Sequence, residues 1–276
     1  MSTAAPTAPG LYSGVPEAVY HGDRNSLSSS GARRLLKVTP WRWKFEQDNP
    51  DPPTDAFDLG TAVHTIVLGT GAPVVDSGYD KWSTNDAKAE VARIRAAGGI
   101  PLRPKDFATA HAAAANVMAH PYAAQLFASG VPELTAYCRD PETGVMMRAR
   151  GDWVHWTGEC SAVIGDLKTS SESGPNDFEW SVDKFGYHCQ QDWYQAVFGE
   201  NGIDTAFVFI VVCTAPPHEV YVVELPARAV ELGARRNRRA LDIYAACSAV
   251  DEWPTHATGL LPIDLPERAY RREEYA

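Results

Sequence analysis

The segment SAVIGDLKTSS, residues 161–171, follows a run of small and apolar residues with two opposite charges, Asp166 and Lys168. In a strand, successive side chains point to opposite faces, so these two charges share one face and Leu167 points to the other. Such a pair is either a surface ion pair, worth about 0–1 kcal/mol, or a metal ligand beside a cation that stabilises an anionic reaction centre. An isolated D-x-K pattern is compatible with both, so the surrounding sequence has to decide.

The flanking sequence predicts an α/β core around this strand. Residues 132–156 have the pattern of two strands around a DPETG turn, and residues 205–225 that of two more strands around a Pro-Pro turn. Between them, residues 177–202 predict one long aromatic-rich helix, and residues 226–250 predict a last amphipathic helix. This order favours a central mixed sheet of about five strands flanked by helices.

The sequence before residue 131 has mainly helical patterns. Capping serine and threonine residues, helical spacing of apolar residues and terminal glycines mark helices within residues 25–47, 54–69, 83–99 and 105–120. We therefore expect a flexible arm over residues 1–10 and a single domain over residues 11–250. Within that domain, residues 11–130 form the mainly helical part and residues 131–250 the α/β core. Residues 251–276 show little periodicity, and we expect them to wrap around the surface as a C-terminal extension.

Composition restricts the class of protein and of partner. The 276 residues are 45% hydrophobic and 22% charged, which is ordinary for a soluble globular protein. No apolar run approaches the ~18–20 residues of a membrane span, and the start MSTAAPTAPG lacks the regions of a secretory signal. We therefore expect a cytoplasmic protein without a membrane partner. The net charge of −10 means that any contact with DNA must come from local basic patches or bound cations.

Four short patterns with chemical side chains follow one another along the chain. Each has a structural alternative: a histidine packed in the core, a surface or turn aspartate, an exposed ion pair, or an aromatic helix face. Together, at spacings that suit a βαβ arrangement, they indicate a functional site. The residues are His64 in GTAVH, Asp152 in RARGDWV, Asp166 and Lys168 in GDLK, and Gln190 and Tyr194 in YHCQQDWY, where the last two share one helix face.

The order G-x-x-x-H, G-D, D-x-K and Q-x-x-x-Y resembles the RecB-like branch of the PD-(D/E)xK nuclease superfamily. The resemblance is greatest to the RecE-type exonucleases (exonuclease VIII-like) of phages and prophages, and it extends over residues 10–250. It implies a restriction-endonuclease-like core and a metal-dependent exonuclease that hydrolyses phosphodiester bonds at linear DNA ends. The acid before x-K is Asp166, where many members of the superfamily carry glutamate; both occur among these nucleases.

The resemblance also implies a metal site. Asp152, Asp166 and the backbone carbonyl of Leu167 would be ligands, and His64 would contribute. Mg²⁺ prefers oxygen ligands and imidazole suits Mn²⁺ better, so either ion is expected. Lys168 would orient the attacking water and stabilise the charged transition state.

Further residues are implied around the metal site and along the DNA. Gln190 and Tyr194 would hold the scissile or an adjacent phosphate. Glu133, at the start of the first core strand, either supports the metal ligands or is an ordinary exposed glutamate. Arg33 and Arg34 are the leading basic candidates for DNA contact. Additional candidates are Lys37, Arg42, Lys44 and the run from Arg235 to Arg239, which is otherwise a solvated helix face, and Trp41 and Trp43, which either stack on unpaired bases or pack in the core.

Two alternative functions share these motifs. A catalytically inactive DNA-end-binding module is disfavoured because the four patterns are intact. A CRISPR-associated-type single-strand exonuclease holds an iron–sulfur cluster through four clustered cysteines, whereas the five cysteines here are scattered without a C-x-x-C; no iron–sulfur cluster is therefore expected. The RecE resemblance additionally implies 5′ to 3′ resection of double-stranded ends, a homo-oligomeric ring around DNA and a single-strand annealing protein as partner. It implies a phage- or prophage-encoded protein in a bacterial host.

Overall fold

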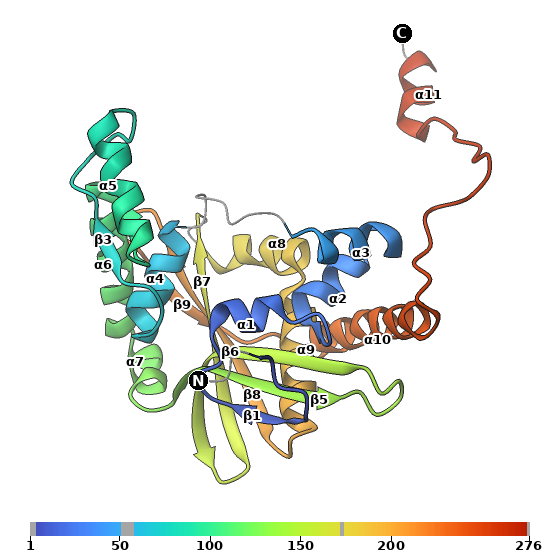
Figure 1. Cartoon of the computed structure of the whole chain (residues 1–276), viewed down its shortest axis with the longest axis horizontal. Coiled ribbons are helices and arrows are strands. Elements are labelled where there is room, and N and C mark those ends of the chain that lie inside the picture. Colours follow the sequence, from blue (N-terminus) through green and yellow to red (C-terminus); the bar gives the residue numbers. More distant parts are fainter. Residues whose placement is uncertain (1–3, 51–57, 172–173, 275–276) are drawn as a thin grey trace.

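The computed structural model describes residues 4–50, 58–171 and 174–274, and its centre is a mixed sheet with helices on both faces (Figure 1). The strands are β1 (Gly10–Tyr12), β2 (Leu27–Ser28), β3 (Val74–Asp76), β4 (Ile100–Leu102), β5 (Val131–Arg139), β6 (Met146–Gly158), β7 (Ser161–Ser170), β8 (Asp204–Cys213) and β9 (Val220–Val223). The helices are α1 (Glu17–Gly22), α2 (Ser29–Leu35), α3 (Pro40–Asp48), α4 (Asp58–Leu68), α5 (Asn85–Ala96), α6 (Pro104–Ala119), α7 (Pro121–Phe127), α8 (Pro175–Phe185), α9 (Tyr187–Gly199), α10 (Ala227–Val250) and α11 (Glu267–Glu274).

The main sheet has the order β1-β5-β6-β7-β8-β9, with β2 paired beside β6. Strands β7 and β8 run parallel, with α8 and α9 between them in the chain, and the other neighbours on the main path are antiparallel. The predicted mixed sheet flanked by helices is confirmed. Within the described residues the sheet has seven strands, whereas about five were expected, because β1 and β2 add to it from the N-terminal part. These strands are three and two residues long, too short to produce an alternating pattern in the sequence.

Two apolar layers cover the sheet. On one face, α2, α8, α9 and α10 pack against it around the fully buried Trp193 and Phe198. On the other face, α4, α6 and α7 pack against Leu167 and Ile210 of the parallel strands β7 and β8. In β7 the alternation of side chains therefore places Leu167 in one layer and turns Asp166 toward the layer that contains α9.

The predicted helix over residues 177–202 is wrong as a single helix. It is divided into α8 and α9 at Gly186, whose φ of 69° lies in the left-handed region. Glycine adopts this conformation without the steric cost that other residues carry, so it ends one helix and lets the chain turn into the next. The break makes Tyr187 the first residue of α9 and brings α9 onto the sheet.

The C-terminal extension does not wrap around the surface as expected. Its first residues are anchored: the Trp253 ring stacks on Trp43 with centroids 5.3 Å apart, and the Pro254 carbonyl accepts from the Trp41 amide at 3.1 Å. Beyond this point the chain leaves the body and ends in α11 (Figure 1), and Leu260 and Ile263 are 99% and 92% exposed. Separately, none of the helices in the described ranges is both long and apolar enough to span a lipid bilayer.

Candidate active site

The site lies where β6 and β7 separate. Their pairing runs from Gly158 and Ser161 to Trp153 and Gly165 and ends there. Beyond that point β6 stays paired with β5 and β7 stays paired with β8. We call this point, where β6 and β7 separate after Trp153 and Gly165, the fork. Backbone groups at the fork need new partners, because buried amides and carbonyls are rarely left unpaired. The next residues along the two strands are Asp152 and Asp166.

The fork is bridged through the peptide groups of Leu167. The Leu167 amide donates to Oδ2 of Asp152 at 2.9 Å, and the Leu167 carbonyl oxygen lies 2.7 Å from Nε2 of His64. The other imidazole nitrogen, Nδ1, is 3.7 Å from Oδ2 of Asp152. A side chain on Gly60 would place Cβ only 3.1 Å from Oγ1 of Thr169. The glycine of G-x-x-x-H therefore lets α4 lie close to β7, which brings His64 within reach of the fork.

Asp166 is the buried centre of the site, with 1% of its surface exposed. Its Oδ2 forms an ion pair with the Lys168 ammonium, and its Oδ1 accepts from Nε2 of Gln190 at 2.5 Å. Burial raises the pKa of the Asp166 carboxyl to about 6, against the lowering effect of Lys168 and with a further rise from the Asp152 charge. Burial alone would lower the pKa of the Lys168 ammonium, but the two carboxylates outweigh it and the pKa is raised. Lys168 is thus held in its charged form.

The donor chemistry of the fork suits a hard divalent cation. In the described part of the chain, no group of three or more His, Cys, Asp or Glu side chains is arranged to hold a metal ion. However, Asp152, Asp166 and the Leu167 carbonyl supply three oxygen donors, and His64 supplies an imidazole. Burial is the main cause of the raised pKa of Asp166 and the Asp152 charge adds to it, and a bound cation would favour the ionised form of both carboxyls. The residues therefore fit the expected Mg²⁺ or Mn²⁺.

The sequence of this chain matches the model of a known protein family. A family model described as "PDDEXK-like domain of unknown function (DUF3799)" matches residues 38–260. The chain belongs to this family. The predicted PD-(D/E)xK fold is confirmed, whereas the RecE-type assignment is finer than the match and stays a prediction.

One solved structure supports the fold. A candidate exonuclease from Eubacterium rectale superposes with a TM-score of 0.62 at 12% sequence identity, covering 93% of this chain and 97% of that one. The protein SSO0001 gives a TM-score of 0.35 at 9% identity, covering 83% of this chain and 86% of that one, which is too distant to support an argument. Among curated proteins, none matches the chain by sequence.

Gln190 and Tyr194 lie on the face of α9 that was predicted to turn toward Asp166. Gln190 is buried and donates to the Asp166 carboxylate. Tyr194 is half-buried, and its ring meets Phe207 edge-on with centroids 5.9 Å apart. Burial raises the pKa of Tyr194 well above its ordinary value, so the phenol stays protonated and can donate a hydrogen bond. The contact between Gln190 and Asp166 was not predicted from the i,i+4 spacing, and the binding of phosphate by both residues stays a prediction.

Most of the predicted DNA-binding cations have partners within the chain. Arg33 donates to the carbonyl oxygens of Ser29 and Phe185, so it braces the end of α8. Arg34 forms two hydrogen bonds, of 2.6 and 2.8 Å, with the Glu46 carboxylate. Lys37 donates to the backbone carbonyl of Lys184. Ion pairs join Arg42 to Glu46, Lys44 to Asp48, Arg236 to Asp183, and Arg238 to Asp140 and Asp242. Of the two tryptophans, Trp43 is buried and Trp41 is 53% exposed.

Glu133 lies beside the fork in an unusual backbone conformation. The register of β5 and β6 pairs Pro132 with Trp153 and Leu134 with Gly151, so Glu133 stands opposite Asp152. Its φ of 50° lies in the left-handed region, which is uncommon for a residue other than glycine. Such strain is concentrated at functional sites. The position agrees with a supporting role for Glu133, which stays a prediction.

The buried arginines beside Asp152 were missed in the sequence. Arg148, Arg150 and Asp152 alternate along β6 and so share one face. The Tyr20 ring of α1 lies over both guanidinium groups, with 5.2 and 4.2 Å from Cζ to the ring centroid. Arg148 also donates to Oγ of Ser26 at 2.8 Å. The sequence did contain this information: in RARGD, residues 148–152, the two arginines alternate with small residues and so lie on the same strand face as Asp152.

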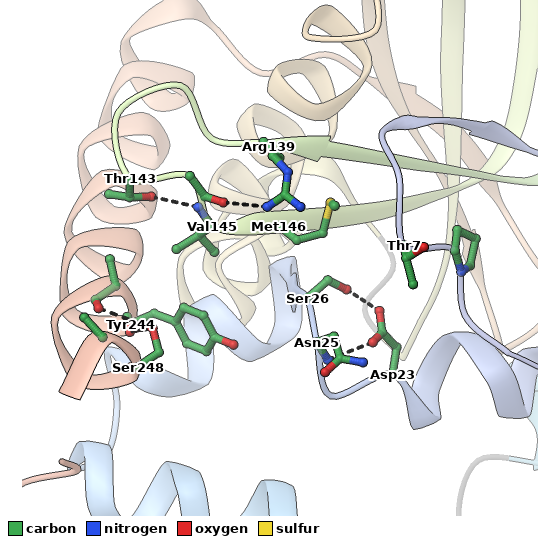
Figure 2. A pocket seen from close by; sticks show the side chains of 14 residues that line it. Thr7, Asp23, Asn25, Ser26, Arg139, Thr143, Val145, Met146, Tyr244 and Ser248 are labelled. Atoms are coloured by element: carbon green, nitrogen blue, oxygen red, sulfur yellow. Dashed lines mark hydrogen bonds between the residues drawn. The ribbon is translucent and has the colours of Figure 1, made fainter. Parts of the chain in front are cut away.

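A separate hollow of about 530 Å³ lies between the N-terminal segment, the β5–β6 turn and α10. Figure 2 shows Asp23 accepting from Ser26 and from the Asn25 amide at one side, with Tyr244 of α10 across from them. None of the predicted site residues is among those that line it. This hollow is therefore distinct from the fork.

His64 gives the first test of the metal site. Removing the imidazole takes away one donor and the hydrogen bond to Leu167, without changing either carboxylate. We expect His64→Ala to weaken Mn²⁺ binding by about 10–100-fold, the scale at which supporting groups of metal sites act. Titration calorimetry with Mn²⁺ measures the affinity, and thermal melting controls for folding. A folded His64→Ala protein with the affinity of the wild type would make His64 a packing residue only.

Proposed function

We propose that this chain is a metal-dependent DNA exonuclease that hydrolyses phosphodiester bonds at linear ends, with 5′ to 3′ resection of double-stranded DNA. One observation carries the proposal: two carboxylates, a backbone carbonyl, an imidazole and a charged lysine converge at the fork between β6 and β7. Membership in a PD-(D/E)xK-like family supports hydrolysis of nucleic acid. The structural similarity to a candidate exonuclease supports action at ends.

Each side chain has a distinct part in this proposal. When bound, a divalent cation would neutralise phosphate charge and lower the pKa of a water molecule. His64, Asp152, Asp166 and the Leu167 carbonyl would hold it, and Gln190 keeps the Asp166 carboxylate in one orientation through its amide. These residues thus arrange the site before the substrate arrives.

The charged groups would act on the phosphate. The Lys168 ammonium would orient the attacking water and stabilise negative charge that develops on the phosphate oxygens, which is effective because Lys168 and Asp166 are largely removed from solvent. The protonated phenol of Tyr194 would donate to a neighbouring phosphate and position the strand. Positioning matters because a displacement of about 1 Å can lower a rate about 100-fold.

The RecE resemblance extends the proposal to the assembly and its surroundings. It would place the chain in a homo-oligomeric ring around duplex DNA, beside a single-strand annealing protein, as a phage- or prophage-encoded component of recombination in the bacterial cytoplasm. The net charge of −10 fits a protein that contacts DNA through local groups and a bound cation and not through a general basic surface.

Digestion of labelled DNA tests the function. Linear duplexes carrying a label at the 5′ or the 3′ end are incubated with Mg²⁺ or Mn²⁺, beside a covalently closed circle of the same sequence. We expect early release of the 5′ label, slow release of the 3′ label and no change in the circle. Cleavage of the circle would contradict action at ends, and digestion of single strands alone, with visible absorbance from an iron–sulfur cluster, would favour the CRISPR-associated type.

A further inference from the structure

The Lys168 ammonium is enclosed by one carboxylate and two aromatic rings. Besides its ion pair with Asp166, Nζ lies 4.8 Å from the centroid of Tyr187 and 6.0 Å from that of Phe209. The Lys168 side chain is only 18% exposed. A lysine carries three donors on a flexible four-carbon stem, and a single carboxylate does not fix its direction. The electron-rich ring faces supply the remaining attraction.

Tyr187 is held rigidly in this position. It is the first residue of α9, directly after the left-handed Gly186, so the break between α8 and α9 sets where its ring lies. The ring stacks on Phe178 and on Phe185, each with a centroid distance of 5.6 Å and an interplanar angle of 28°. It also lies 5.6 Å from Phe209. The Lys168 ammonium lies over the face of this ring.

We propose that Tyr187 is a positioning residue, whose ring face aims the Lys168 ammonium at the reacting phosphate; this rests on the proposed function. Cation–π attraction is strongest where the cation is removed from water, as it is here. Without the ring, the Lys168 stem can rotate away from the phosphate while the ion pair with Asp166 still forms. The chemistry would then slow although DNA still binds.

The competing explanation is that Tyr187 only packs the aromatic cluster. Phe185 provides the control, because it stacks on Tyr187 but its ring faces the ammonium of Lys184, whereas the rings of Tyr187 and Phe209 face that of Lys168. Leucine keeps apolar volume at either position and removes the ring. Tyr187→Phe keeps the ring and removes only the hydroxyl group.

Steady-state kinetics on linear duplex DNA separates these cases. We expect Tyr187→Leu to lower kcat by about 10–30-fold with little change in KM, which corresponds to losing one desolvated cation–π contact. Tyr187→Phe should restore kcat to within about twofold of the wild type. Phe185→Leu removes one ring stacked on Tyr187 and leaves the ring over Lys168 in place, so it should lower kcat far less than Tyr187→Leu does. If Tyr187→Phe is as slow as Tyr187→Leu, or Phe185→Leu falls equally, the proposal is wrong.

A second measurement decides the point without any cleavage. In protein labelled with ¹³C-lysine, a ring over Nζ shifts the neighbouring Hε signals of Lys168 upfield, and Lys168→Arg identifies those signals. We expect the upfield shift in the wild type and in Tyr187→Phe, and its loss in Tyr187→Leu. Absence of the shift in the wild type overturns the proposal even if a variant fails to fold. Failure of the wild type to cut DNA would instead count against the proposed function and leave this result standing.

Discussion

Asp166→Ala and Lys168→Ala are each expected to abolish cleavage of linear DNA while the protein stays folded. Asp166 meets both Lys168 and Gln190, so its loss removes the centre of the site. Lys168 is the charged group expected to stabilise the transition state, and removing one such donor costs on the order of 10²–10³-fold in rate. We expect a loss of at least this size for either variant.

Single-turnover cleavage of an end-labelled duplex measures the effect, and melting followed by circular dichroism controls for folding. Lys168→Ala leaves a buried carboxyl without its counter-charge, so Asp166 should take up a proton and remain neutral. The double variant Asp166→Asn, Lys168→Met removes both charges and checks that inactivity does not come from unfolding. Glu179→Ala, which changes an exposed carboxylate of α8, should cut like the wild type. Wild-type cleavage by a folded Asp166→Ala or Lys168→Ala protein would show that D-x-K is not the reaction centre.

Gly233→Ala is expected to have the largest effect on stability. Gly233 lies in α10 where it crosses α9, and a Cβ there would be 2.2 Å from the His188 carbonyl oxygen and 3.1 Å from Cα of Cys189. These are backbone atoms, so no side chain can rotate to make room, and the two helices must move apart. We expect the free energy of unfolding to fall by about 3 kcal/mol, at the upper end for overpacking. Since α9 carries Gln190, cleavage should fall as well.

Urea unfolding followed by circular dichroism measures this change. Gly199→Ala is the matched control, because Gly199 ends α9 and a Cβ there would meet no atom within 4 Å. That variant should be neutral or more stable by about 0.5–1 kcal/mol, since alanine favours a helix. An unchanged midpoint for Gly233→Ala would mean that α9 and α10 do not approach this closely.

The sequence by itself determined the order of the core elements and which side chains share a face. Alternation along residues 161–170 placed Asp166 and Lys168 together and Leu167 opposite, and the structure has them so. The i,i+4 spacing of Gln190 and Tyr194 oriented both toward Asp166. These properties follow from the periods of a strand and a helix, which depend on the chain within a few residues.

Only the tertiary structure decided which of these groups meet. Pairing between β6 and β7 stops after Trp153 and Gly165, and that register places Asp152 at the amide of Leu167. The packing of α4 on β7 brings His64, 103 residues away in sequence, to the Leu167 carbonyl. In the same way, Arg34 pairs with Glu46, and the ring of Tyr187 lies over Lys168.

The physical reason is that a period specifies a face but not its partner. Partners depend on strand register, on the left-handed break at Gly186 and on the close approach that Gly60 and Gly233 allow between elements. Each of these is settled by packing across the whole sheet, where a shift of one residue would turn every side chain of a strand to the other face. Local sequence patterns therefore identify the candidate reactive residues, and the tertiary packing brings them together where β6 and β7 separate.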